Sequence, residues 1–205
     1  MSESCTIAVA HQKGGVGKTT TTLLLAHELA DLRPDWRVLV EDLDPYRHLT
    51  QRWPGDTLTL ALVEDGTEEG DIRLLDTGPG DSPTFLHALN RADYVIVPVR
   101  PEPLSAQALG AFLPVLQQVQ RRRGGPPALA GVVLTHVGPG RGRRLVQRQV
   151  EVFAAELGTE ILACIPISDR IGVYLSTQGH HYRPAAERVA RLVEARQQAS
   201  NAVSV

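Results

Sequence analysis

The stretch His11-Gln12-Lys13-Gly14-Gly15-Val16-Gly17-Lys18-Thr19-Thr20 follows the apolar run 6–10 and precedes a segment, 21–32, whose leucines recur with helical spacing. A strand, a glycine-dense turn and a helix in this order are typical of a phosphate-binding loop, whose backbone N–H groups converge on phosphate oxygens at the positive end of the helix. In such a loop the lysine before the helix reaches the β- and γ-phosphates, and the hydroxyl after it ligates Mg²⁺. The predicted nucleotide-binding residues are therefore Gly14, Gly15, Val16, Gly17, Lys18, Thr19 and Thr20.

The loop differs from the ordinary motif at one position and carries a second lysine. Gln12 stands five residues before Gly17, where the motif has a glycine. Lys13 and Lys18 are the chain's two lysines, against 19 arginines, and lysine offers the compact ammonium that fits among phosphates. The sequence Lys-Gly-Gly-Val-Gly-Lys-Thr resembles that of the deviant phosphate-loop ATPases, which include ParA partition proteins, MinD and the nitrogenase iron protein. This resemblance implies ATP held between two subunits, with catalytic roles for Lys18 and for Lys13, which would reach the partner's nucleotide.

A second motif lies at 41–53, after an apolar strand expected at 37–42. Ligands of a doubly wound sheet bind beyond the carboxyl ends of its strands, so Asp42 and Asp44 are expected to face the phosphate site. The stretch resembles the second signature of ParA-type proteins, with Tyr46 in place of the usual glutamine and His48 in place of Ser or Asn. The resemblance implies that Asp44 positions the hydrolytic water and that Asp42 lies near the metal. The two substitutions put the metal contacts and the rate of hydrolysis in question.

A third motif is the apolar run 72–75, which ends in Asp76 and has the Walker B layout. The carboxylate at the end of such a strand meets Mg²⁺ through water. The predicted metal-site residues are Thr19, Asp42 and Asp76. In related proteins the adenine base lies against residues after two later strands, which here makes Thr135 and Pro166 the candidates. A plain role in the core and in a turn is the alternative for both.

Strands and helices alternate along the chain, which predicts a single domain over 1–205 with a doubly wound, mostly parallel sheet and helices on both faces. Six strands are expected, at 6–10, 37–42, 72–76, 93–99, 130–136 and 161–166. Helices are expected at 21–32, from a cap at Ser82 or Asp81 to 92, from within the segment 100–109 to about 123, at 141–157 and at 184–198. The Gly-, Asp- and Glu-rich segment 54–71 is interpreted as an excursion with a short helix around 58–63.

The charge is unevenly distributed. Residues 1–120 hold 9 basic and 17 acidic side chains, whereas residues 121–205 hold 12 arginines and 6 acids. The basic part permits contact with a polyanion, and a solvated arginine-rich surface is the alternative. The absence of a long apolar run or a signal-like start favours the cytoplasm, where Cys5 and Cys164 would stay reduced. Those cysteines do not match the cluster ligands of the nitrogenase iron protein.

ParA-type partition proteins are therefore the favoured relatives. This implies a Mg²⁺-dependent ATPase that forms an ATP-dependent homodimer, binds DNA non-specifically and works with a centromere-binding ParB-like or ParG-like protein in the nucleoid, away from the membrane. The DNA-binding candidates are Arg141, Arg143, Arg144, Arg148 and Arg170, with help from Arg121–Arg123. The alternatives are a MinD-like or cargo-positioning ATPase on a membrane or protein scaffold, and a scaffold that has lost most turnover. The last helix is interpreted as packing on the core, because it has no large aromatic anchor for a membrane surface.

Overall fold

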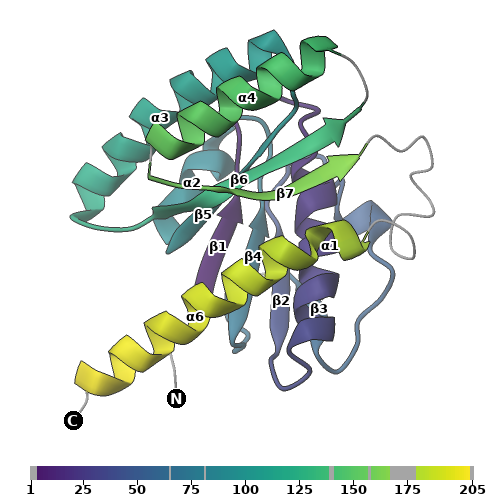
Figure 1. Cartoon of the computed structure of the whole chain (residues 1–205). Coiled ribbons are helices and arrows are strands. Elements are labelled where there is room, and N and C mark those ends of the chain that lie inside the picture. The colour runs from purple at the N-terminus through teal and green to yellow at the C-terminus, as the bar shows by residue number, and fades with distance from the viewer. Residues whose placement is uncertain are drawn as a thin grey trace.

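The computed structural model describes residues 4–64, 66–80, 82–138, 141–156, 158–166 and 179–203. Within these ranges seven strands form one parallel sheet in the order β3-β2-β4-β1-β5-β6-β7 (Figure 1). The strands are β1 (Cys5–Val9), β2 (Val38–Asp42), β3 (Leu60–Val63), β4 (Ile72–Asp76), β5 (Tyr94–Val99), β6 (Ala128–Val137) and β7 (Ile161–Pro166). The α-helices are α1 (Lys18–Leu32), α2 (Pro83–Arg91), α3 (Pro103–Arg123), α4 (Arg141–Glu156) and α6 (Arg183–Val203), and the short 3₁₀ turns are η1 (Thr50–Arg52) and η3 (Gly179–Tyr182).

The sheet is buried on both faces, and each face has its own apolar core. Helices α1 and α6 cover one face, while α2, α3 and α4 cover the other (Figure 1). Successive residues of a strand point to opposite faces, so Ile7 and Leu74 pack toward α1 and α6 while their neighbours Ala8 and Leu75 pack toward the other helices. The nearly continuous apolar strands of the sequence follow from this two-sided burial.

The topology brings three strand ends together. Helix α1 connects β1 to β2 on one face, and α2 connects β4 to β5 on the other, so the connections diverge at β1. In the β1–β4 pair Val9 lies opposite Asp76, and in the β2–β4 pair Asp76 lies opposite Asp42. The divergence point of a doubly wound sheet is where such folds bind ligands, and here it collects two of the predicted metal-site carboxylates.

The short helix predicted around 58–63 is wrong. Leu60–Val63 forms the edge strand β3, which pairs with β2 so that Val38 lies opposite Leu60 and Glu41 opposite Val63. The leucines at 58, 60 and 62 are spaced by two residues, which is the period of a strand and not of a helix. Leu60 is buried, and the first of these leucines, Leu58, lies exposed before the strand begins.

The other predicted elements are confirmed, with shifted ends. Helix α1 begins at Lys18, three residues earlier than predicted, which puts the threonines of the loop in its first turn. The Ser82 hydroxyl caps α2 by accepting a hydrogen bond from the backbone N–H of Phe85 at 3.3 Å. Helix α6 buries Val189 and Val193 in the core against α1, as its interpretation as a core-packing helix requires. No helix in the described part of the chain is long and apolar enough to cross a membrane.

Candidate nucleotide-binding site

The phosphate loop connects β1 to α1 and is held in place by β6. Gly15 and Gly17 have φ of 71° and 95°, a left-handed conformation that glycine adopts without strain. The Thr135 hydroxyl donates a 2.7 Å hydrogen bond to the carbonyl of Val16. A Cβ on Gly17 would lie 3.2 Å from the Thr135 methyl carbon, so the loop and the strand are in close contact. The sequence predicts Thr135 as an adenine contact, and the structure uses its hydroxyl to support the loop.

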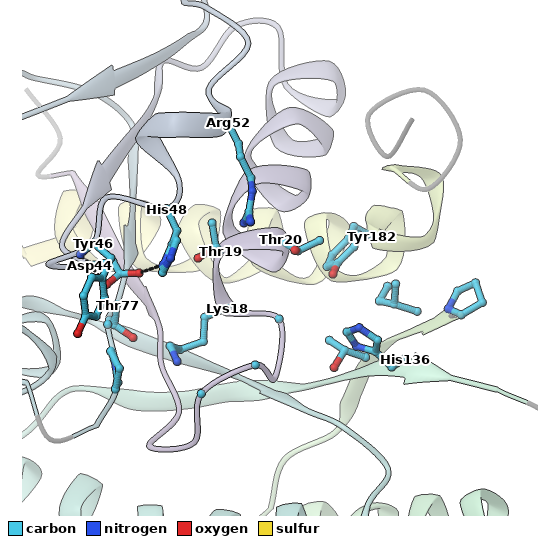
Figure 2. Close-up of a pocket in the computed structure, with 18 residues that line it drawn as sticks. Lys18, Thr19, Thr20, Asp44, Tyr46, His48, Arg52, Thr77, His136 and Tyr182 are labelled. Atoms are coloured by element: carbon cyan, nitrogen blue, oxygen red, sulfur yellow. Dashed lines mark hydrogen bonds and ion pairs between the residues drawn. The ribbon is translucent and has the colours of Figure 1, made fainter. Parts of the chain in front are cut away.

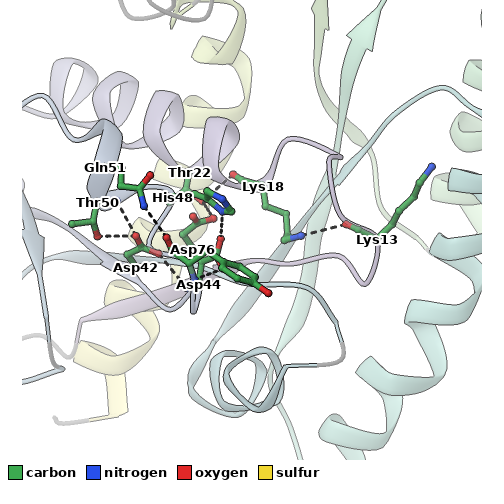
Figure 3. A network of polar contacts seen from close by, with 10 residues as sticks. Lys13, Lys18, Thr22, Asp42, Asp44, His48, Thr50, Gln51 and Asp76 are labelled. Atoms are coloured by element: carbon green, nitrogen blue, oxygen red, sulfur yellow. Dashed lines mark hydrogen bonds and ion pairs between the residues drawn. The ribbon is translucent and has the colours of Figure 1, made fainter.

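Lys18 is buried at the start of α1, and its Nζ donates to the backbone carbonyl of Lys13 at 3.3 Å (Figure 3). Burial lowers the pKa of Lys18, and the carboxylates of Asp76 and Asp44 oppose that effect. Beside it His11 is fully buried, with its Nδ1 accepting the backbone N–H of Lys13. Burial, with the charges of both lysines, lowers the pKa of His11 to about 4, so this ring stays neutral next to two cations.

Asp76 ends β4 at the bottom of the site and is completely buried. Its Oδ1 accepts a 3.2 Å hydrogen bond from the Thr22 hydroxyl, while its Oδ2 is buried with no hydrogen-bond partner among the described residues. Burial raises the pKa of Asp76 to about 7, an effect that the Thr19 hydroxyl opposes and the Asp42 charge adds to. A buried carboxylate oxygen without a partner is costly unless a cation or a donor meets it.

These residues fit Mg²⁺. The ion takes oxygen ligands in an octahedron, keeps several waters, and is bound through one or two protein groups plus substrate phosphates. Thr19 and Asp76 offer a hydroxyl and a carboxylate next to the phosphate loop. Within the described ranges no group of three or more His, Cys, Asp or Glu side chains is placed to hold a metal ion.

Asp42 fastens the segment that follows β2. Its Oδ2 accepts hydrogen bonds from the backbone N–H and the hydroxyl of Thr50, at 2.8 and 2.7 Å, and its Oδ1 accepts the N–H of Asp44 at 3.1 Å (Figure 3). Asp42 lies opposite Asp76 in the β2–β4 pair, so it ends β2 beside the site, as the sequence predicts. Its oxygens serve the loop 43–50, so Asp42 sets the position of the residues that line the pocket.

Asp44 and His48 lie together at one side of the pocket. Asp44 is 6% exposed; its Oδ1 accepts the backbone N–H of Tyr46 at 3.1 Å, and its Oδ2 lies 2.6 Å from Nδ1 of His48 (Figures 2 and 3). A Cβ on Gly78 would lie 2.8 Å from the Pro45 ring, so the glycine that follows the β4 motif makes room for this segment. The pair of Asp44 and His48 was not predicted, because the sequence gives His48 only as a substitution.

The pocket has a volume of about 430 Å³ and extends from the phosphate loop to the ends of β6 and β7. Its lining includes Thr20, Thr135, His136, Ile165, Pro166 and Tyr182, and Figure 2 shows Thr20, His136 and Tyr182 on the side away from Asp44. The predicted base-site candidate Pro166 lines the pocket at the end of β7, which lies on the other side of β1 from β2 and the Asp44 that follows it. Tyr182 is fully buried, with its hydroxyl 3.2 Å from that of Thr21, and was missed because η3 lies far along the chain and carries no motif. A volume of this size is typical of a small-ligand site.

Lys13 points away from the pocket. Its Nζ pairs with Glu102 at 3.2 Å, and Figure 3 shows the side chain directed away from Lys18 and the acidic residues. Arg100 also pairs with Glu102, at 3.1 Å, and donates to the carbonyl of Gly15 at 3.5 Å. The sequence did not single out Arg100 and Glu102, which begin the segment leading into α3.

The predicted DNA-binding arginines are only partly described. Arg144 and Arg148 are exposed on α4, Arg141 and Arg143 belong to its first turn, and Arg170 lies outside the described residues. The helping cluster 121–123 ends α3, before β6 begins, whereas α4 begins after β6 ends. Ten strand residues, about 33 Å, separate the two groups, so they do not form one patch. Arg123 moreover donates to the backbone carbonyls of Leu89 and Ala92 at the end of α2.

Residues 7–179 match the model of the CobQ/CobB/MinD/ParA nucleotide binding domain. The chain is 33% identical to the chromosome-partitioning ATPase Soj of Thermus thermophilus, over 92% of this chain and 97% of Soj. It is 36% identical, over half of each protein, to the maintenance of carboxysome distribution protein A of Gloeobacter kilaueensis. The chain therefore belongs to the CobQ/CobB/MinD/ParA family, whose ParA and MinD members are ATPases.

Solved structures share the fold. An ATP complex of McdA from Cyanothece has a TM-score of 0.75 at 17% identity, over 96% of this chain and 97% of that one. Cobyrinic acid a,c-diamide synthase from Mycobacterium smegmatis, with bound ADP and magnesium, has a TM-score of 0.71 at 24% identity, over 92% and 95%. These structures agree with the predicted class of a doubly wound parallel sheet that carries a phosphate loop.

The contact between Thr135 and the phosphate loop gives a first prediction. Thr135→Val keeps the shape of the side chain and removes the donor to the Val16 carbonyl, which costs about 1–3 kcal/mol when the acceptor is buried. We expect a lower melting temperature and roughly tenfold weaker binding of a fluorescent ATP analogue. Thr135→Ser, which keeps the hydroxyl, serves as the matched control. Unchanged affinity in Thr135→Val would mean that the loop does not depend on β6.

Proposed function

We propose that this chain is a ParA-type partition ATPase, which binds Mg²⁺ and ATP in the pocket, hydrolyses ATP slowly, and uses the cycle to segregate plasmid or chromosomal DNA. The observation that carries the proposal is the junction of three strand ends, where the phosphate loop and Asp44 line one pocket and Asp76 lies buried at the end of β4, the middle strand of the three. Similarity to Soj over nearly the whole chain supports the partition role.

We assign separate roles to the phosphate loop, the metal-site residues and Asp44. The backbone N–H groups of 14–18 and the Lys18 ammonium bind the β- and γ-phosphates. Thr19 and Asp76 would hold Mg²⁺, which would supply positive charge to offset the charge that develops on the phosphates during transfer. Asp44 faces the position from which water attacks the γ-phosphate. Most of the work is therefore positioning and electrostatic stabilisation, as in other phosphoryl-transfer enzymes.

The dimer of the proposal uses Lys13 on the partner's nucleotide. A lysine held by Glu102 of its own chain must leave that carboxylate before it can cross to a second subunit. The ion pair is partly exposed, with 31% and 43% of the two side chains accessible, so it is a weak restraint that ATP-driven association can break. Glu102 thus acts as a holder of Lys13 in the single chain.

Glu102→Gln removes this restraint and is expected to favour the ATP-bound dimer. Exposed ion pairs contribute about 0–1 kcal/mol, so the dimer dissociation constant should fall by no more than about fivefold. Sedimentation velocity with a non-hydrolysable ATP analogue measures it, with ADP as the comparison. Glu187→Gln, on α6 and remote from the loop, is the matched control. A weaker dimer in Glu102→Gln would show that Glu102 supports the interface instead.

DNA binding is assigned to the exposed arginines of α4. A basic surface holds DNA by phosphate contacts that release counterions, so such binding carries no sequence preference and falls steeply with salt. These contacts would lie on α4, which begins at the carboxyl end of β6, the same end of the sheet as the pocket. Cytoplasmic association with the nucleoid follows from this contact, with a ParB-like or ParG-like protein as the partner that stimulates hydrolysis.

The double substitution Arg144→Glu/Arg148→Glu tests this surface. With ATP, wild-type protein should bind a random-sequence duplex and release it as salt rises, and the variant should bind at least about tenfold more weakly. Arg121→Glu/Arg122→Glu makes the same change of charge at the other end of the sheet and should bind as wild type does. Fluorescence anisotropy with ATP, ADP and no nucleotide gives the three affinities. Absence of DNA binding in every state would refute the DNA-carrier role.

A second candidate function is the positioning of protein cargo. It is supported by the similarity of half of the chain to the carboxysome distribution protein of Gloeobacter kilaueensis. The two functions share the ATP site and differ in what the ATPase moves. The location of a labelled protein shell or of a labelled plasmid in cells with and without this chain distinguishes them.

A further inference from the structure

His48 lies between Asp44 and the phosphate loop, in the wall of the pocket (Figure 2). Its Nδ1 is 2.6 Å from Oδ2 of Asp44, and its side chain is 48% exposed to the pocket and solvent. The loop that carries it is fixed on both sides, because Asp42 binds Thr50 after it and the N–H of Arg47 before it donates to the carbonyl of Asp44. The imidazole is therefore held in a fixed position in the wall of the pocket.

The hydrogen bond to Asp44 sets the tautomer of the ring. An ionised carboxylate only accepts hydrogen bonds, so Nδ1 is the donor, and in the neutral ring Nε2 carries a lone pair. A carboxylate that orients an imidazole in this way is the arrangement by which histidine becomes an effective general base. Asp44 itself already accepts a hydrogen bond on each oxygen, from Tyr46 and from His48.

We propose that His48 is a catalytic residue of ATP hydrolysis in this chain and that Asp44 acts as the residue that orients it. This inference rests on the proposed function. Nε2 accepts a proton from water as the water oxygen forms a bond to the γ-phosphorus and the bond from that phosphorus to the β,γ-bridging oxygen breaks. ADP and inorganic phosphate leave, and the imidazolium returns its proton to phosphate or solvent.

The substitution His48→Asn separates a general base from a residue that only holds Asp44 in position. His48→Asn places an N–H near the position of Nδ1, so it can still donate to Asp44, but it has no lone-pair nitrogen on the far side. A residue that only positions Asp44 would tolerate this change. A general base contributes about 10²–10⁴-fold, so we expect kcat of His48→Asn to fall by at least about 100-fold.

The experiment measures steady-state phosphate release from Mg²⁺ and ATP, with ATP affinity measured separately. The predicted result is a lower kcat in His48→Asn with an ATP dissociation constant within about twofold of wild type. Added imidazole should raise the kcat of His48→Ala at least about tenfold, because it supplies the missing base. His87→Asn, an exposed histidine on α2, is the matched control and should leave kcat unchanged.

The outcomes distinguish the two levels of the proposal. Wild-type protein that binds ATP but releases no phosphate would contradict the proposed function itself. If wild type hydrolyses ATP, Asp44→Asn is inactive and His48→Asn keeps kcat within threefold, the assignment of His48 is wrong while the ATPase stands. No response of His48→Ala to imidazole would also overturn the base role, because a missing proton acceptor would then not account for the lost turnover.

Discussion

The site depends on backbone hydrogen bonds that continue the parallel sheet beyond its strands. The N–H of Leu43 donates to the carbonyl of Asp76 at 2.9 Å, and the N–H of Gly80 donates to that of Gln12 at 3.1 Å. The Thr77 hydroxyl adds a bond to the Val9 carbonyl at 2.9 Å. These bonds fix the segments after β1, β2 and β4 to one another. The phosphate loop after one strand and the carboxylates on the two other strands are therefore held in fixed positions relative to one another.

The close approach of these segments explains one departure from the ordinary loop motif. A Cβ on Gly80 would lie 2.5 Å from the Cα of Gln12, so the glycine after β4 provides the space that the glutamine occupies. The loop thus has a glutamine where the ordinary motif has a glycine, and the neighbouring segment has a glycine at the point of contact. Any larger residue at Gly80 would displace the loop on which Lys18 and Thr19 lie.

The charged side chains at the carboxyl ends of these strands lower the stability of the folded chain. Asp42, Asp44 and Asp76 are all buried, and Lys18 is the nearby buried cation. Burial of charge costs several kcal/mol per ion unless partners compensate, and the pKa of Asp76, raised to about 7 by burial, reflects that cost. A magnesium ion next to Asp76 would supply the missing opposite charge. Structures keep such costly groups chiefly where binding or catalysis uses them.

The sequence predicts what local pattern determines. Strand, loop and helix periodicity gave the doubly wound sheet, and the acids at the strand ends gave the positions of Asp42 and Asp76. Local pattern failed at Leu60–Val63, where pairing with β2 decided the structure, and for Tyr182, whose place in the pocket depends on packing against α1. The contact of His48 with Asp44 depends on how the loop folds between Asp42 and Thr50, which the two substitutions alone do not reveal.

The central claim is that the three strand ends form one site for ATP and Mg²⁺. Calorimetric titration of ATP with and without Mg²⁺, on wild type and on Asp76→Asn, tests it most directly. We expect Mg²⁺ to strengthen ATP binding by wild type at least about tenfold, and Asp76→Asn to bind ATP without Mg²⁺ as well as wild type but to lose the magnesium effect. Equal ATP binding by wild type with and without Mg²⁺, or a full magnesium effect in Asp76→Asn, would contradict the account.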